Sequence, residues 1–342
     1  MEIRKMRKIS LFAAALLAAS VGPTLAQDYT KDKSPVNATI AGAAPQGIFA
    51  TAGEAVNEMV RREYPNSAVT YEPGSTAGSL ARMMSGQVPL ATAHSPIDVA
   101  AALNGTEPFK QKMPAENLRV IARVTEGMHP YVFARPDFAG KHQIKTMGDL
   151  FKKPLPMRIN LNQKGTLPVY HQALALLEYY KTSEDQIKKN GGDPTYLPTT
   201  AALDALKDGK IDVIIWVGFT PDRNARQLID QDGMIMLPIE EAAIDHVAKK
   251  FNLEKEWIKA GTYKGQDKDL PATSLPIFMS AGPSADDRTV YAVTNSIIKH
   301  FEYFRSVHPL FKTYQPAMLV NVGSLKMHPA AEKAYREAGL LK

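Results

Sequence analysis

The chain has 342 residues and no cysteine. The lack of cysteine excludes disulfides, cysteine-ligated zinc, a thiol nucleophile and the acylated cysteine of a bacterial lipoprotein. The formal net charge is +6, of which residues 1–26 supply +3, and no basic block is interleaved with aromatic residues, so nucleic-acid binding is not expected.

The first 26 residues have the three parts of a secretory signal peptide. A basic segment, MEIRKMRK, precedes a short apolar run, ISLFAAALLAASVG, and small residues lead to a cleavage site after Ala26. The apolar run is shorter than the roughly 20 residues that a membrane helix needs, and an uncleaved anchor is the alternative interpretation. We therefore expect an exported protein that does not span the membrane after cleavage.

Short apolar segments alternate with amphipathic segments along the rest of the chain. The pattern predicts strands at 38–41, 68–71, 90–93, 118–124, 131–134, 157–161, 195–197, 212–217, 234–239 and 277–281. Clear helices are predicted near 52–60, at 286–304 and at 329–338. Strands that alternate with helices are typical of parallel sheets with right-handed crossovers, so the expected fold class is α/β.

Two segments divide the strands into two series. Residues 134–145 precede the second series, and residues 260–276, rich in Gly, Pro and charge, follow it. A chain that leaves one lobe, builds another and returns forms a clamshell, whose cleft is a natural ligand site. We predict a discontinuous lobe 1 from residues 27–138 and 263–342, and lobe 2 from residues 139–262.

Five loops follow the carboxyl ends of predicted strands, and four of them lead into helices. They read GAAPQGIFATAGEAV, PGSTAGS, HSPID, NQKGTLPV and GFTPDRNA. In an open parallel sheet these ends share one edge, where helix N-termini present free N–H groups and a partial positive charge. Glycine allows close approach and hydroxyl groups add donors, so the loops favour a carboxylate or another small anion.

Structural roles are the alternative for each loop. Ser75 or Thr76 can cap a helix, Gly78 can serve packing, His94 can be a structural residue, and Lys164 and Arg223 can be solvated charges. Catalysis has little support, because NQKGT lacks the order of a phosphate loop and GSTAGS is not a nucleophile elbow. The eight histidines show no metal spacing. We predict no catalytic residue, metal or cofactor.

The segment AGTYKGQDKDLPATSLPIF (260–278) resembles a signature of the solute-binding subunits of TAXI-type TRAP transporters. PGSTAGSLARMMSGQVPLATAHS, LKDGKIDVIIWVGFTPDRNARQL (206–228) and HPAAEKAYREAGLL (328–341) resemble further blocks of that family. The similarity covers nearly all of residues 36–341. It implies a type II periplasmic-binding-protein fold, with two α/β lobes joined by crossing strands and a ligand cleft between them.

The resemblance also implies a function. Such a subunit is a monomeric periplasmic receptor that closes on a small organic anion, such as glutamate, glutamine or 2-oxoglutarate, and delivers it to the TRAP membrane permease subunits. Transferred by position, the implied ligand contacts are Gln46, Gly47, Ile48, Phe49, Gly74, Ser75, Thr76, Ala77, His94, Ser95, Asn162, Gln163, Lys164, Gly165, Thr166, Val217, Gly218 and Phe219.

Departures from the family pattern predict a changed ligand. PQGIFA keeps an aromatic residue only at Phe49, and His94, where the family commonly has Gln, can carry charge under mildly acidic conditions. Lys164, Phe219 and Arg223 are additions. These differences favour an acid other than glutamate, bulkier or aromatic. A periplasmic enzyme, a receptor for a membrane sensor kinase and a binding protein of another carrier system are the rival interpretations.

Overall fold

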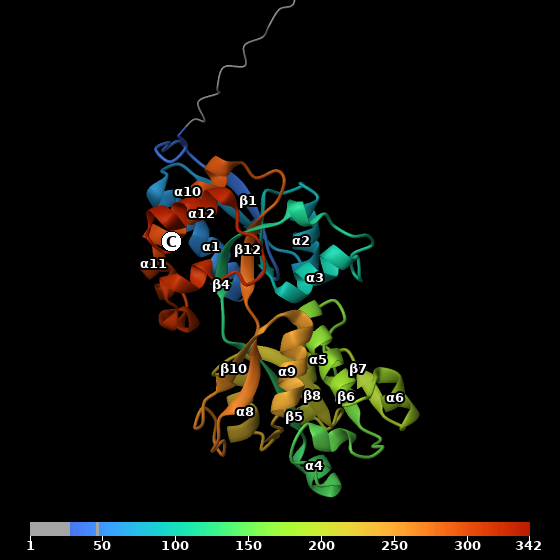
Figure 1. Ribbon diagram of the computed structural model, residues 1–342. Helices are drawn as coiled ribbons and strands as arrows, with labels where there is room; N and C mark the ends of the chain where they lie inside the picture. Colours follow the sequence, from blue (N-terminus) through green and yellow to red (C-terminus); the bar gives the residue numbers. More distant parts are fainter. Residues whose placement is uncertain (1–27, 46–47) are drawn as a thin grey trace, which may run out of the picture.

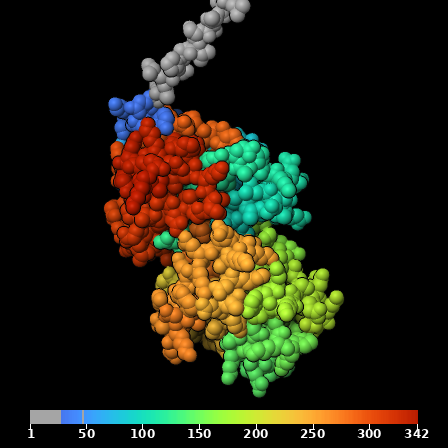
Figure 2. Space-filling model, viewed as in Figure 1, coloured from blue at the N-terminus to red at the C-terminus, as the bar shows by residue number. Residues whose placement is uncertain are grey.

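The structure is a computed structural model that describes residues 28–45 and 48–342. It has two α/β lobes, one above the other in Figure 1, and the same two masses meet across a waist in Figure 2. The predicted signal peptide and the predicted contacts Gln46 and Gly47 lie outside the described residues. Within the described residues, no helix is long and apolar enough to cross a membrane.

Lobe 1 is built on a five-stranded sheet in the order β2-β1-β3-β12-β4. Its strands are β1 (Asn37–Ala41), β2 (Ala68–Glu72), β3 (Leu90–His94), β4 (Arg119–Thr125) and β12 (Ile277–Ala281). Its helices are α1 (Ile48–Glu63), α2 (Thr76–Met84), α3 (Pro96–Asn104), α10 (Asp287–Lys299), α11 (Phe301–Ser306) and α12 (Pro329–Glu337), with short 3-10 helices at Ala115–Asn117, Pro309–Thr313 and Pro316–Val320. In Figure 1, α2 and α3 lie to the right of the sheet and α10 to α12 to the left.

Lobe 2 has a five-stranded sheet in the order β7-β6-β8-β5-β9. Its strands are β5 (Met128–Ala134), β6 (Arg158–Asn160), β7 (Asp193–Thr195), β8 (Val213–Phe219) and β9 (Ile235–Met236). Its helices are α4 (Pro136–His142), α5 (Leu167–Tyr179), α6 (Glu184–Lys189), α7 (Thr199–Lys207), α8 (Arg223–Asp230) and α9 (Glu241–Phe251), with a 3-10 turn at Gly148–Phe151. An antiparallel ribbon of β10 (Glu254–Ile258) and β11 (Leu270–Ser274) completes it.

The expectation of parallel sheets holds for only part of each sheet: β2-β1-β3 and β7-β6-β8 are parallel. In lobe 1, β12 runs antiparallel to both β3 and β4, and in lobe 2, β5 runs antiparallel to both β8 and β9. The reason is the route of the chain. Strands β5 and β12 each begin where the chain arrives from the other lobe, so they run away from that lobe. The parallel strands run in the opposite direction and end at the edge of the sheet that faces the other lobe.

The chain crosses between the lobes at residues 126–127 and 275–276. The backbone N–H of Leu275 donates to the carbonyl of Met128 at 3.0 Å, so the two crossings lie side by side. The first crossing comes before the predicted boundary at 138, and the second comes after 263. The Pro-containing segment from 134 is the start of α4, with Pro136 in its first turn, rather than a linker.

Most predicted strands and helices match elements of the structure, and the differences have local causes. The ribbon strands β10 and β11 were not predicted, because β10 is largely exposed and charged, and β11 contains Pro271. The helix predicted at 286–304 is divided at His300 into α10 and α11. In α1 the predicted three- and four-residue spacing is confirmed: Ala52, Ala55, Val56, Met59 and Val60 are all buried.

Candidate ligand-binding site

A cavity of about 770 Å³ is bordered by both lobes. Lobe 1 supplies Ser75, Ala77 and Gly78 from the N-terminal end of α2, and lobe 2 supplies Gly165 from the loop before α5. The volume lies within the range of roughly 300–1,000 Å³ typical of small-molecule sites. The structure therefore brings together Ser75, Ala77 and Gly165, three residues predicted from loops that are far apart in the sequence.

The N-terminus of α2 is formed by a serine cap. Ser75 has extended backbone geometry, and its Oγ accepts a hydrogen bond from the N–H of Gly78 at 3.1 Å. Ser79 donates its N–H to the Ser75 carbonyl. The first two helical residues, Thr76 and Ala77, have N–H groups without intrahelical acceptors. The positive end of the helix dipole and these N–H groups therefore lie beside the cavity.

A buried carboxylate links the loops after β2 and β3. The Asp98 carboxylate accepts hydrogen bonds from the Ser95 N–H at 2.8 Å, from the Ser95 hydroxyl at 2.7 Å and from the Thr76 hydroxyl at 3.1 Å. Asp98 is fully buried, and burial raises the pKa of its carboxyl while these bonds oppose the rise. The predicted contacts Thr76 and Ser95 are thus oriented by a residue that sequence reasoning missed.

The sequence does contain a signal for Asp98. Ser95 and Asp98 form a capping box at the start of α3, with the spacing S-x-x-D in SPID. Such a pattern predicts that both side chains bond to the backbone of the helix terminus. It does not predict the third bond, from Thr76, because that residue comes from another strand–helix loop.

His94 lies inside the protein rather than at a ligand surface. Its side chain is fully buried, Nε2 is 2.8 Å from the Ser280 Oγ, and Nδ1 has no hydrogen-bond partner among the described residues. Burial lowers the pKa of His94 to about 4. The expectation of a charged His94 under mildly acidic conditions is therefore wrong, because transfer of the imidazolium from water costs too much.

The loop before α5 is held by Asn162. This residue is buried, with a left-handed φ of 69°, and its Nδ2 donates to the Thr199 Oγ1 at 2.8 Å while its Oδ1 accepts from the Gln163 N–H at 2.9 Å. Gln163, Lys164 and Gly165 are exposed. Asn162 therefore shapes the loop from within, and the exposed residues form its surface.

Lys164 and Thr166 differ in their surroundings. The Lys164 Nζ lies 4.3 Å from the centre of the Tyr196 ring and 5.9 Å from that of Tyr170, an arrangement typical of cation–π contacts. Thr166 is half-buried and precedes α5 without a side-chain capping bond. The Thr166 hydroxyl is thus the better placed of the two to act as a donor near the α5 N-terminus.

The loop after β8 borders a different cavity. Val217 and Gly218 are buried, whereas half-buried Phe219 lines a hollow of about 390 Å³. Its other lining residues include Glu126 and Gly127 of the first crossing, Glu256 of β10, and Pro309, Leu310, Thr313 and Tyr314 of lobe 1. Phe219 is therefore not among the residues that line the cavity at Ser75 and Gly165. Both hollows are bordered by the two lobes.

Gly218 leaves room for a helix cap. A Cβ at this position would lie 2.3 Å from the Asp222 Oδ2, and the Asp222 Oδ1 accepts from the N–H of Ala225 at 2.9 Å to cap α8. The N–H of Asp222 donates to the Tyr263 hydroxyl at 2.7 Å, and that hydroxyl is 2.7 Å from the Tyr131 hydroxyl. Tyr263 of the signature segment thus buttresses this loop.

We expect Gly218→Ala to lower the free energy of unfolding by about 1–2 kcal/mol, because the added Cβ displaces the Asp222 carboxylate and the α8 cap is lost. Urea unfolding followed by circular dichroism measures the change. Gly140→Ala is the control, since a Cβ there meets open space in α4 and alanine favours a helix. Equal loss in both variants would contradict the packing role of Gly218.

The remaining predicted contacts belong to the first two loops. Ile48 and Phe49 begin α1 and are half-buried, and neither lines the cavities described above. Gly74 is exposed and donates its N–H to the Ala43 carbonyl at 2.7 Å, which joins the loops after β1 and β2. A Cβ at Gly42 would lie 2.0 Å from the Tyr71 ring, so this glycine of the first loop serves packing.

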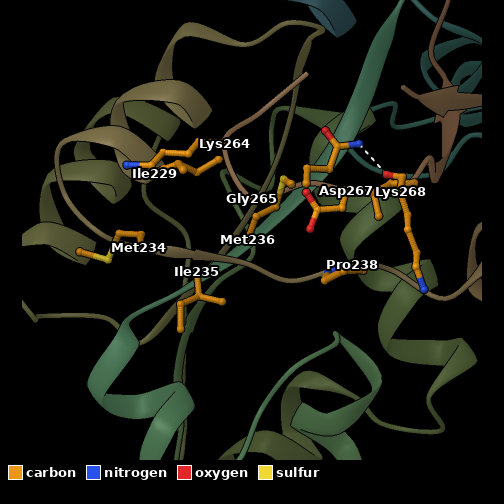
Figure 3. Close-up of a pocket in the computed structure, with 11 residues that line it drawn as sticks. Ile229, Met234, Ile235, Met236, Pro238, Lys264, Gly265, Asp267 and Lys268 are labelled. Atoms are coloured by element: carbon orange, nitrogen blue, oxygen red, sulfur yellow. Dashed lines mark hydrogen bonds between the residues drawn. The ribbon is translucent and has the colours of Figure 1, made fainter. Parts of the chain in front are cut away.

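A further hollow of about 460 Å³ lies within lobe 2 (Figure 3). Its lining comes from the end of α8, from β9 and from the loop before β11: Ile229, Met234, Ile235, Met236, Pro238, residues 264–268 and Leu270. Figure 3 shows the Lys264 side chain beside Ile229. None of the predicted ligand residues lines this hollow, and only one lobe borders it. In the part of the chain that the structure describes, no three or more His, Asp or Glu residues are grouped to hold a metal ion.

Solved structures share this architecture. MatC from Rhodopseudomonas palustris with bound malate is 13% identical in sequence, and the alignment covers 90% of this chain and 100% of the MatC chain with a TM-score of 0.51. PhnD1 from Prochlorococcus marinus in complex with methylphosphonate is 10% identical in sequence, and the alignment covers 91% of this chain and 100% of the PhnD1 chain with a TM-score of 0.52. At this identity the likeness concerns the fold alone, which is the two-lobed type II periplasmic-binding-protein fold. The sequence pattern of the NMT1-like family matches residues 40–339. The chain belongs to the NMT1-like family.

Proposed function

We propose that the protein is a periplasmic solute receptor that binds a small organic anion between its lobes and delivers it to a TRAP-type membrane permease. The observation that carries this proposal is the cavity between the α2 N-terminus and Gly165 at the start of α5. The resemblance of residues 260–278 to the TAXI signature supports the transporter type. The receptor acts as a monomer, without a cofactor.

The geometry explains how an anion would be held. The N–H groups of Thr76 and Ala77 and the positive dipole end of α2 favour a carboxylate on the side of lobe 1. The Thr166 hydroxyl and the Leu167 N–H provide donors on the side of lobe 2, because Pro168 has no N–H and the Val169 N–H donates to the Thr166 carbonyl. Rotation about the two adjacent crossings at 126–127 and 275–276 would bring these donors onto one ligand. Opening would release the ligand unchanged.

A binding role is favoured over catalysis by the state of the hydroxyl groups. The Ser75 oxygen caps α2, and the Thr76 hydroxyl donates to buried Asp98. His94, the histidine of the predicted loops, is buried against Ser280 rather than beside either hydroxyl. No histidine therefore accompanies these hydroxyl groups at this cavity in the described residues, and the carboxylate beside Thr76, that of Asp98, is fully buried.

Thermal unfolding with a panel of acids tests the proposal. The mature protein is unfolded and refolded to remove carried-over ligand, and then heated with amino acids, dicarboxylates, keto acids and aromatic acids. A ligand at ~1,000 times its Kd adds ~4 kcal/mol of stability, so one class of acid should raise Tm clearly. Absence of any rise across the panel would contradict the proposal.

A variant tests the loop that contributes Gly165 to the cavity. We expect Thr166→Ala to weaken binding of the best acid by about tenfold to a hundredfold, because a hydrogen bond to a charged group contributes about 1.5–3 kcal/mol. Isothermal titration calorimetry measures Kd. Thr200→Ala, at an exposed position on α7, is the matched control and should bind normally. Equal affinities for Thr166→Ala and wild type would remove this loop from the site.

A further inference from the structure

The cavity at Ser75 and Gly165 continues along α2 as a groove. Its lining includes Ala77, Gly78, Ala81, Arg82 and Ser85, which recur at three- and four-residue steps and so lie on one face of the helix. Residues 108–111 and Met113 form the opposite wall. A helix of this length extends about 13 Å, so the groove leads well away from the opening between the lobes.

The walls of the groove contain an anchored apolar strip beside polar residues such as Ser85, Gln87 and Gln111. Ala77 and Ala81 face it from α2, and Pro108, Phe109 and Met113 face it from the other side. Phe109 is buried, and its N–H donates to the Thr106 carbonyl at 2.9 Å. The N–H of Met113 donates to the Ala102 carbonyl of α3 at 2.9 Å. The second wall is thus fixed to α3, and the groove is present before a ligand binds.

The charges along the groove are of one sign. Arg82 and Lys110 are its charged lining residues, and no carboxylate lines it in the described part of the chain. Arg82 is held by two hydrogen bonds to the Glu72 carboxylate, at 2.9 and 3.0 Å. No ion pair is found for Lys110 among the described residues. The Glu72 carboxylate offsets the charge of Arg82, so the charge of Lys110 is what favours an anionic occupant over an organic cation.

We propose that the ligand is an organic acid with one anionic head and an extended apolar body, such as a medium-chain alkyl or an aryl-alkyl carboxylate. This inference rests on the proposed function. The head lies at the N-termini of α2 and α5, and the body lies along α2 against Ala81, Phe109 and Met113. The residues that determine specificity are then in segment 108–113 and on α2, outside the five predicted loops.

Calorimetric titration with straight-chain acids from acetate to octanoate, with succinate and octylamine for comparison, tests the inference. Each added methylene that enters the groove should strengthen binding by roughly fourfold, so that octanoate binds far more tightly than butanoate. Octylamine should bind weakly because it lacks the anionic head. Octylamine binding as tightly as octanoate would overturn the inference.

Ala81→Trp narrows the groove midway along α2 and should flatten the dependence on chain length, so that octanoate loses at least tenfold in affinity. Ala100→Trp, at an exposed position on α3, is the matched control and should keep the wild-type dependence. Circular dichroism checks folding of both variants. If Ala81→Trp does not fold, Met113→Gln, which makes the wall polar at similar volume, should weaken octanoate more than butanoate.

The outcomes separate this inference from the proposed function. If acids bind with no dependence on chain length, and Ala81→Trp has no effect, the receptor function stands and the inference fails. If only long dicarboxylates bind tightly, and Lys110→Gln abolishes that binding, the ligand carries a second anionic group in place of the apolar body, and the inference fails. If Ala81→Trp binds acids normally but abolishes uptake in cells, the groove is a docking face for the permease. If no acid of any length or class binds, both proposals fail.

Discussion

Replacing Asp98 by alanine is expected to lower the free energy of unfolding by about 2–4 kcal/mol. The substitution removes the acceptor of three hydrogen bonds and leaves the buried Ser95 N–H and the half-buried Thr76 hydroxyl unpaired. A buried donor without a partner costs about 1–3 kcal/mol. Because the two loops flank the candidate site, ligand affinity should fall as well. Urea unfolding and calorimetric titration measure the two effects.

Two comparison variants isolate the cause. Asp98→Asn keeps an acceptor oxygen of the same size and should recover a large part of the stability. Asp230→Ala removes an exposed carboxylate near the end of α8 and should change stability little. If Asp98→Ala were as stable as Asp230→Ala, the buried carboxylate would not organise these loops.

Acidification is expected to destabilise the protein between pH 6.5 and 4, and His94 accounts for about 3 kcal/mol of the loss. Burial lowers the pKa of His94 in the folded protein to about 4, below the value of about 6.5 of an unfolded histidine. The unfolded chain therefore binds a proton first as the pH falls through this range, and protons favour unfolding. The full stability from this residue is present above pH 6.5.

Urea unfolding at a series of pH values measures this effect. His94→Gln should show a clearly shallower loss of stability between pH 6.5 and 4, whereas His142→Gln, which removes a half-buried histidine of α4, should follow the wild type. Part of the loss should persist in His94→Gln, because burial also lowers the pKa of His129 to about 4. Identical pH profiles for wild type and His94→Gln would show that folding does not lower the pKa of His94.

The sequence by itself determined the local features of this protein. Alternation of apolar and amphipathic segments predicts most strands. Helix α5 begins directly after NQKGT, as expected, whereas α2 begins at Thr76, within the predicted loop PGSTAGS. These features depend on residues within a few positions of one another: hydrophobic spacing, a serine cap, or glycine at a turn. For the same reason, the sequence identifies PGSTAGS and NQKGT as polar segments at helix N-termini.

The tertiary structure decided which loops share a cavity and which side chains are free. Only the packing of the lobes brings Ser75 to Gly165, and it assigns Phe219 to a separate hollow. Burial makes His94 a neutral core residue, and Asp98 engages Thr76 across two loops. The residues 108–113 that line the groove have no motif of their own. Each of these features depends on contacts between residues far apart in the chain. Exclusion of water at those contacts, rather than local spacing, determines whether a side chain is charged and whether a ligand can reach it.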